Sequence, residues 1–154
     1  MIYLASDHRG FELKVKIKSW LREWGETFED FGPETFIAND DYPDYISRVG
    51  QQVSAHQDER GIVFGLTGEG EAIVCNKYRG VRTAVYSGGN IKIVKLSREH
   101  NDANVLSLGA GFIDEPKAKK VIKLWLDTKF SGDVRHIRRL EKIRNIEALN
   151  FKID

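Results

Sequence analysis

The sequence predicts an α/β protein with a three-layer, Rossmann-like fold, in which helices cover both faces of a five-stranded parallel sheet. Short apolar runs alternate along the chain with segments whose apolar residues recur every three or four positions, which is the pattern of strands alternating with helices. Apolar runs of this kind fit strands that are buried on both faces. No repeat, low-complexity tract or linker interrupts the 154 residues, so residues 1–154 are expected to form one domain.

Five apolar runs are expected to be the strands of that sheet. The first is Met1–Ser6, and the second, Thr27–Phe31, comes after a glycine at position 25 that ends the preceding helix. The other three are Gly61–Phe64, Val81–Val85 and Val105–Leu108.

The segments between these runs are expected to be helices, each with an apolar face. Pro43 suits the first turn of one helix, and Asp114-Glu115-Pro116 is a start signal for another. The residues expected to face the core are Leu13, Ile17, Trp20, Leu21, Trp24, Ile46, Val49, Val53, Ile73, Cys75, Ile91, Val94, Leu96, Ala118, Val121, Ile122 and Trp125.

The final helix, expected over 133–150, has a different apolar pattern. Its apolar residues recur every three positions, so at 3.6 residues per turn they wind around the helix instead of forming one stripe. We therefore expect this helix to lie between its own domain and a second subunit. Four basic residues form a narrow edge of the same helix and are expected to bind a phosphate group: Arg135, Arg138, Arg139 and Lys142.

The composition is that of an ordinary soluble globular protein, with 41% apolar and 31% charged residues. A net charge of +1 provides no global field that would recruit nucleic acid or an acidic membrane. No apolar stretch is long enough to span a bilayer, and the first apolar run meets Asp7-His8-Arg9 too early for a secretory signal. The single cysteine, Cys75, excludes an internal disulfide framework, and a cytoplasmic location is expected.

The segment Gly65–Glu71, with the sequence Gly-Leu-Thr-Gly-Glu-Gly-Glu, carries the strongest indication of function. It joins an expected strand to an expected helix, so its backbone N–H groups are available to an anion. The carboxylate of Glu71 stands at the lip of this turn, and a base beside such donors can remove a proton from carbon next to a carbonyl. This combination indicates an enzyme. Asp7-His8 and His100-Asn101 are expected to converge with the turn beyond the carboxyl ends of the strands.

Each of these groups also has a structural explanation. Glu71 could interact with the helix dipole, and His100 could cap a loop. Asp7 could cap a turn, and Tyr42 could form a hydrophobic staple. The basic edge of the final helix could simply be solvated. The ligand types would allow a metal site, but no compact ligand spacing is present and no metal is expected on the set Asp7, His8, His100 and His136.

Five segments, in the same order along essentially the whole chain, resemble the ribose-5-phosphate isomerase type B family, which also includes galactose-6-phosphate isomerase subunits. They are Ser6-Asp7-His8-Arg9-Gly10, Asp41-Tyr42-Pro43, Thr67-Gly68-Glu69-Gly70-Glu71 with Asn76-Lys77, Arg98-Glu99-His100-Asn101, and Arg135-His136 with Arg139. The resemblance implies a parallel α/β dimer, sometimes paired into a tetramer, that interconverts an aldose phosphate and its ketose without a metal or other cofactor.

The resemblance also implies roles for the catalytic groups. The imidazole of His100 would assist opening of the sugar ring, with the carboxylate of Asp7 close by. A base would then move a proton between C2 and C1 through an enediolate. The hydroxyl of Thr67 and the amides of the turn at Gly68 and Gly70 would stabilise that oxyanion.

Two branches of the family differ in the base. One branch uses a cysteine, whose position in this chain is Gly65, and the other uses a glutamate at the position of Glu71. The chain therefore resembles the glutamate branch, with Glu71 as the base.

Further positions would bind the substrate. His8, Arg135 and Arg139 would hold the phosphate group, the two arginines reaching in from the partner subunit. Tyr42 and Asn101 match positions that contact the sugar.

Three positions depart from the family pattern. Gly111 stands where many relatives carry a phosphate-binding arginine, Leu66 replaces a common glycine, and Glu69 adds a carboxylate to the turn. These departures bear on the substrate more than on the type of reaction. Conversion of ribose 5-phosphate to ribulose 5-phosphate is expected. The alternatives are a six-carbon sugar phosphate, such as allose or galactose 6-phosphate, and a non-catalytic phosphosugar sensor.

Overall fold

The computed structural model describes residues 1–150, and residues 151–154 lie outside that range. Five parallel strands form one sheet in the order β2-β1-β3-β5-β4. The strands are β1 (Ile2–Ser6), β2 (Phe28–Asp30), β3 (Arg60–Gly65), β4 (Thr83–Tyr86) and β5 (Val105–Gly109). The expected five-stranded parallel sheet is confirmed.

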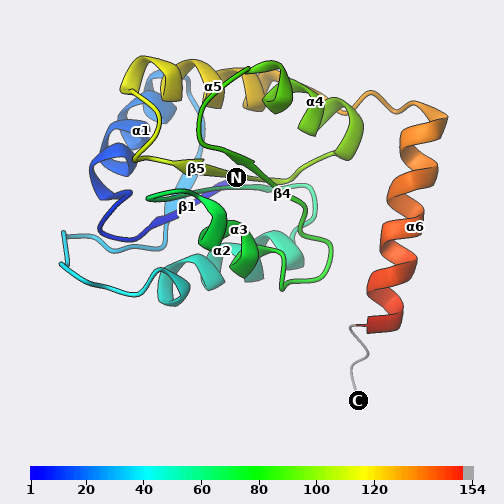
Figure 1. The fold of residues 1–154 in the computed structure, drawn as a ribbon, viewed down its shortest axis with the longest axis horizontal. Helices are drawn as coiled ribbons and strands as arrows, with labels where there is room; N and C mark the ends of the chain where they lie inside the picture. The colour runs from blue at the N-terminus through cyan, green and yellow to red at the C-terminus, as the bar shows by residue number, and fades with distance from the viewer. Residues whose placement is uncertain (151–154) are drawn as a thin grey trace.

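Helices cover both faces of the sheet (Figure 1). One layer contains α1 (Phe11–Glu23), α4 (Lys92–Asn101) and α5 (Glu115–Asp127). The opposite layer contains α2 (Tyr42–Ala55) and α3 (Glu69–Cys75), and α6 (Val134–Asn150) stands apart from both layers. None of the helices described in residues 1–150 is long and apolar enough to cross a bilayer.

Each central strand contributes side chains to two apolar cores, which explains its continuous apolar sequence. In β1, Ile2 and Leu4 pack with α1 and α5, whereas Tyr3 and Ala5 pack with α2 on the other face. Successive side chains of a strand point to opposite faces, so a strand with helices on both sides is apolar at most of its positions.

One residue expected in the core is on the surface. The side chain of Ile73 in α3 is 60% exposed, so that expectation is wrong. The short helix instead buries Glu71, Ala72 and Cys75 against the sheet and α2, and Ile73 lies on the opposite side of the same turn. The burial of Cys75 is confirmed.

The fourth strand begins two residues later than expected, at Thr83. The backbone N–H of Val81 donates to Tyr78 O in a turn, and the N–H of Arg82 donates to the side chain of Asn104 at 2.8 Å. These two residues therefore form a connection at the amino end of β4.

A change in the direction of winding occurs between β1 and β3, which are neighbours in the sheet. The helix that follows β1 lies on one face and the helix that follows β3 lies on the other. Crevices at such points are the usual ligand sites of open α/β sheets. Ser6 pairs with Phe64, so Asp7 lies beside Gly65, the last residue of β3, at the carboxyl edge of the sheet.

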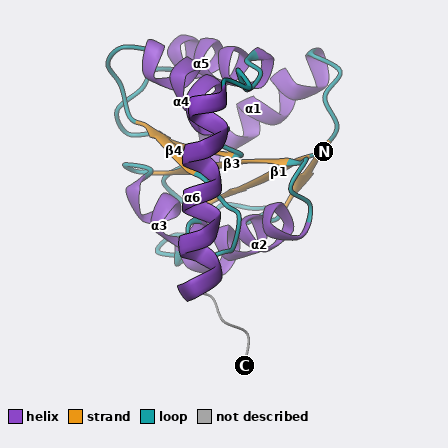
Figure 2. Ribbon diagram, turned by 90° about the vertical axis from the view of Figure 1, so that its right-hand side faces the viewer, coloured by secondary structure: helices purple, strands orange, loops and turns teal. Residues whose placement is uncertain are grey.

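Helix α6 crosses the opposite, amino edge of the sheet (Figures 1 and 2). It buries only His136 and Leu140 against its own domain. Its other apolar residues are exposed: Val134, Ile137, Ile143, Ile146 and Leu149. The helix thus has apolar groups on more than one side, as its three-residue periodicity predicts.

Candidate active site

The glycine turn between β3 and α3 forms a tight cradle against β5. Gly68 precedes the helix with a φ of 82°, in the left-handed region that glycine adopts without strain. A Cβ on Gly68 would lie 3.1 Å from Gly109 N, so the turn also approaches the neighbouring backbone closely. Ser107 Oγ donates to Gly68 O at 2.6 Å, and Thr67 Oγ1 accepts from Glu69 N–H at 3.2 Å. These two hydrogen bonds fix the backbone conformation of the turn, one from β5 and one from within the turn.

The carboxylate of Glu71 is folded back over Gly65 at the end of β3. The residue is only 4% exposed, and a Cβ added to Gly65 would lie 1.8 Å from Glu71 Oε1. Burial raises the pKa of Glu71, the nearby charge of Asp7 raises it further, and a hydrogen bond to a backbone N–H partly opposes this. A buried carboxylate with a raised pKa is a stronger base than an exposed one.

The absence of a side chain at Gly65 gives a first prediction. Gly65→Ala is expected to displace the Glu71 carboxylate, because methyl and carboxylate cannot share the space. Misplacing a catalytic group by about 1 Å costs roughly a hundredfold in rate. Kinetics of Gly65→Ala would show this as a fall in kcat with little change in the thermal midpoint, since the flexible carboxylate can move. Unchanged turnover would show that the position of the carboxylate is unimportant.

Asp7 and His8 lie beside the turn, as expected, at the end of β1. Asp7 is 7% exposed, and its Oδ1 accepts hydrogen bonds from Arg9 N–H at 2.9 Å and Gly10 N–H at 3.1 Å. Turn capping therefore accounts for one oxygen of Asp7. The charge of Asp7 also acts on Glu71, which places the two carboxylates in the same neighbourhood.

Asp40 also lies at this edge, in contact with His8, and the sequence did not indicate it. Its Oδ1 accepts from the backbone N–H of His8 at 2.9 Å and lies 2.7 Å from His8 Nδ1. Its Oδ2 is buried without a hydrogen-bond partner among residues 1–150. The only available signal was its position beside the Asp41-Tyr42-Pro43 motif. Asp40 holds the His8 imidazole at the carboxyl edge. Because a carboxylate oxygen is an acceptor, this contact assigns a proton to Nδ1 of His8.

Tyr42 begins α2 and reaches the same turn. A Cβ on Gly70 would lie 2.8 Å from Tyr42 Cζ and 2.9 Å from its hydroxyl oxygen, so the phenol ring rests on the glycine backbone. The ring also packs at the margin of the apolar core beneath α2. Tyr42 therefore combines a packing role with a hydroxyl beside the cradle.

Two departures from the family pattern touch one another. A Cβ on Gly111 would lie 2.5 Å from Leu66 Cδ1, so the leucine side chain covers the glycine. Leu66 is 44% exposed. An apolar surface thus occupies the place from which an arginine at position 111 would extend.

His100 and Asn101 do not lie at this edge, so their expected convergence with the glycine turn within one chain is wrong. They end α4, which runs back from the carboxyl edge to the amino edge of the sheet. Arg82, immediately before β4, donates from Nε to Asn101 O at 3.1 Å. The β5 strand separates the two edges by roughly 16 Å at about 3.3 Å per residue.

The His100 imidazole stacks on His136 of α6, with ring centroids 4.2 Å apart and an interplanar angle of 15°. His136 is 2% exposed and was not predicted as a site residue. Arg135 Nε donates to His136 Nε2 at 3.2 Å, so this nitrogen acts as an acceptor. Burial lowers the pKa of His136, and His100 and Arg135 lower it further. Arg135 and Arg139 are exposed beside this stack.

One chain does not assemble the metal set considered from the sequence, because Asp7 and His8 lie at one edge and His100 and His136 at the other. Among residues 1–150, one group of potential ligand atoms lies within 4.8 Å, from Asp7, His8 and Asp40. One oxygen of each carboxylate already accepts from backbone N–H groups. Metal independence stays a prediction.

A buried carboxylate next to an amide cradle, at the switch point of a parallel sheet, defines the class of enzymes that move protons on carbon beside a carbonyl. The family model for Ribose/Galactose Isomerase matches residues 2–143, and the chain belongs to that family.

Comparison with individual proteins agrees with this assignment. The ribose-5-phosphate isomerase B of Mycolicibacterium paratuberculosis is 34% identical over 146 residues, covering 95% of this chain and 91% of the relative. A structure of ribose-5-phosphate isomerase B from Mycoplasma genitalium with bound ribulose-5-phosphate superposes with a TM-score of 0.90 at 37% identity, covering 95% of each chain. The Clostridium thermocellum enzyme gives a TM-score of 0.89 at 39% identity, with 97% and 98% covered.

Proposed function

We propose that this protein interconverts ribose 5-phosphate and ribulose 5-phosphate, with Glu71 as the base. The observation that carries the proposal is the buried Glu71 carboxylate above Gly65, beside the amide cradle. The Mycoplasma genitalium relative, solved with bound ribulose-5-phosphate, supports the choice of a five-carbon substrate.

The proposed reaction moves protons only. After the ring opens, Glu71 takes the proton from C2 of the aldose, and the electron pair passes onto the C1 carbonyl oxygen. The resulting enediolate is stabilised by N–H groups of the turn at Gly68 and Gly70 and by the Thr67 hydroxyl. The C2 proton then returns to C1 while the O2 hydroxyl proton moves to O1, which yields the ketose with no atom gained or lost.

The substrate phosphate and ring oxygen require groups that one chain does not bring to Glu71. His100, Asn101, Arg135 and Arg139 lie at the amino edge, too far from Glu71 for one substrate to reach both. We infer that a second copy supplies these four residues, so that each site is shared between two subunits. The exposed apolar residues of α6 support this arrangement, because they offer a surface for the partner.

A coupled assay with five- and six-carbon sugar phosphates tests the substrate. We expect turnover of ribose 5-phosphate, and of allose or galactose 6-phosphate more weakly or not at all. Preferential turnover of a six-carbon substrate would instead assign the Leu66–Gly111 surface to a longer sugar. Binding of a sugar phosphate without turnover of any of them would instead identify the protein as a non-catalytic phosphosugar sensor.

The dimer gives a second prediction. Light scattering is expected to give twice the chain mass of 17.6 kDa at micromolar concentration, or four times if dimers pair. The double variant Ile143→Asp/Ile146→Asp is expected to be monomeric and inactive, because it places charges on the exposed apolar side of α6. The matched control is Val15→Asp, at a similarly exposed position on α1. A fully active monomer would exclude the shared site.

We also propose a cytoplasmic location. The one cysteine, Cys75, is buried and unpaired by any disulfide in the described residues, which suits a reducing compartment.

A further inference from the structure

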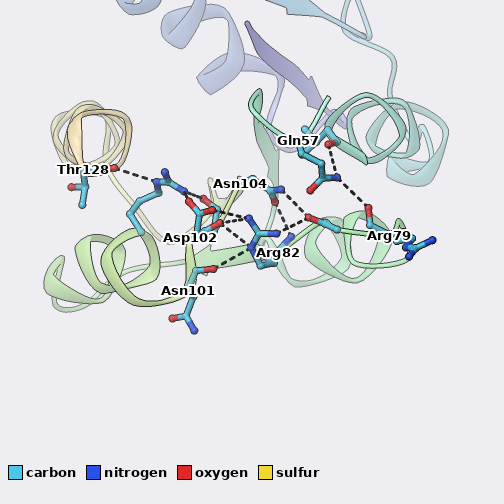
Figure 3. Close-up of polar contacts among 11 residues, drawn as sticks. Gln57, Arg79, Arg82, Asn101, Asp102, Asn104 and Thr128 are labelled. Atoms are coloured by element: carbon cyan, nitrogen blue, oxygen red, sulfur yellow. Dashed lines mark hydrogen bonds and ion pairs between the residues drawn. The ribbon is translucent and has the colours of Figure 1, made fainter. Parts of the chain in front are cut away.

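The end of α4, which carries His100 and Asn101, is held by an ion-pair network at the amino edge of the sheet (Figure 3). The helix is closed by Asp102, whose φ of 45° lies in the left-handed region. Residues other than glycine rarely adopt this conformation, so the surrounding contacts must stabilise it.

Arg82 supplies most of these contacts. Its Nε donates to Asn101 O at 3.1 Å and to Asp102 O at 3.0 Å. Its Nη2 donates to Asp102 O at 2.8 Å and Asp102 Oδ2 at 3.1 Å, and its Nη1 donates to Gly80 O at 3.0 Å. One guanidinium thus fixes the backbone of both residues that follow His100.

Arg98 binds Oδ1, the other oxygen of the Asp102 carboxylate. Its Nη1 donates to Asp102 Oδ1 at 2.8 Å and to Ala103 O at 2.6 Å, and its side chain is only 7% exposed. Its Nε donates to Thr128 O at 3.2 Å, in the connection that leads to α6. Arg98 therefore ties the end of α4 to the segment that places His136 against His100.

The network exceeds what ending a helix requires. Among the other helices of residues 1–150, α1 and α2 end with backbone N–H donors and no guanidinium. The last turn of α5 accepts one such bond, from Arg60 Nη1 to Leu126 O at 2.7 Å. Arg82 and Asp102 also line a cavity of about 510 Å³ between α6 and the amino edge. Shortening either side chain enlarges a polar space and leaves the apolar core intact.

We propose that Arg82 and Asp102 are positioning residues for ring opening: by fixing the end of α4, they hold the His100 imidazole in the orientation that the substrate of the partner subunit requires. This proposal rests on the proposed isomerase function. It assigns to the two residues an effect on one step of the reaction, because the network fixes the backbone directly after His100 and makes no contact with the turn that carries Glu71.

The two steps can be measured separately. Ribose 5-phosphate is mostly a closed ring, so its turnover requires ring opening. Ribulose 5-phosphate cannot form a five-membered ring because its O5 carries the phosphate, so deuterium exchange at its C1 in D₂O reports proton transfer alone. The most informative variant is Asp102→Gly, since glycine accepts the left-handed conformation while the carboxylate is lost. Arg82→Ala and Arg82→Lys complete the series, with Arg79→Ala as a neighbouring control.

For Asp102→Gly and Arg82→Ala we expect kcat for ribose 5-phosphate to fall roughly tenfold to a hundredfold, with KM and C1 exchange of ribulose 5-phosphate changed less than about threefold. Arg82→Lys should recover part of the loss, and Arg79→Ala should match the wild type. Equal losses in both measurements, or no loss in either, would overturn the proposal. A wild-type protein inactive in both measurements would instead refute the proposed function itself.

Discussion

Glu71→Gln is expected to abolish isomerisation and leave the fold intact. Glutamine has nearly the shape of glutamate and fits over Gly65, but its amide cannot accept the C2 proton. Loss of a general base costs roughly 10²–10⁴-fold in rate. Both turnover of ribose 5-phosphate and deuterium exchange at C1 of ribulose 5-phosphate should fall together, because both need this base.

The matched control is Glu69→Gln in the same turn. Glu69 is exposed, whereas Glu71 is 4% exposed, so removing the Glu69 charge should leave turnover within about twofold of the wild type. Near-normal turnover of Glu71→Gln, or equal losses in the two variants, would remove Glu71 from the role of base.

The pH dependence of wild-type activity also tests the assignment of Glu71 as the base. Because burial raises the pKa of Glu71 above its ordinary value of 4.5, the acid limb of kcat/KM should lie above that value. The folded protein therefore binds the proton of the Glu71 carboxyl group more tightly than the unfolded chain does. This protonation stabilises the fold fully below pH 4.5, and the stabilisation is lost as pH rises through the raised pKa.

Glu71→Gln should not show this loss of folding stability with rising pH, because glutamine has no charge to bury. Its thermal midpoint is therefore expected to exceed the wild type's above the raised pKa and to converge with it in acid. Thermal unfolding across this pH range checks the direction. A wild-type midpoint that rises relative to the variant with increasing pH would mean that the carboxylate is stabilised, and not destabilised, by its surroundings.

The fold was predictable because its strands and helices repeat simple local patterns. An apolar run such as Gly61–Phe64 favours burial on both faces, which leads to a parallel sheet between helices. Ile73 shows the limit of this reasoning. An apolar residue in a seven-residue helix has too few neighbours in sequence to reveal which side faces the sheet.

The carboxyl edge of the site was also predictable, since Asp7 and the glycine turn directly follow strands that lie next to each other. Asp40 was not, because its partner His8 is 32 residues away and the intervening loop has no periodic pattern. The placement of His100 failed for a different reason. A residue at the end of a helix in an α/β unit lies at the amino edge of the next strand. His100 would therefore reach a carboxyl edge only in the site of another subunit, as we propose.

Mixed dimers give the decisive result for this two-edge arrangement. Glu71→Gln and His100→Asn homodimers are each expected to have little ribose 5-phosphate activity. If His100 acts across the interface, a dimer with one chain of each kind contains one site with both groups intact and one site with neither. Random pairing of equal amounts should then restore about a quarter of wild-type activity, since half of the dimers are mixed.

If Glu71 and His100 acted from the same chain, every site in a mixed dimer would carry one defect, and no activity would return. Co-expression with two affinity tags allows the mixed dimer to be purified, where the expected activity is about half that of the wild type. The His100→Asn homodimer provides an internal check, because it should retain deuterium exchange at C1 of ribulose 5-phosphate while Glu71→Gln does not. Because the two edges of one sheet are separated by the length of its strands, recovered activity requires that a catalytic unit contain two chains.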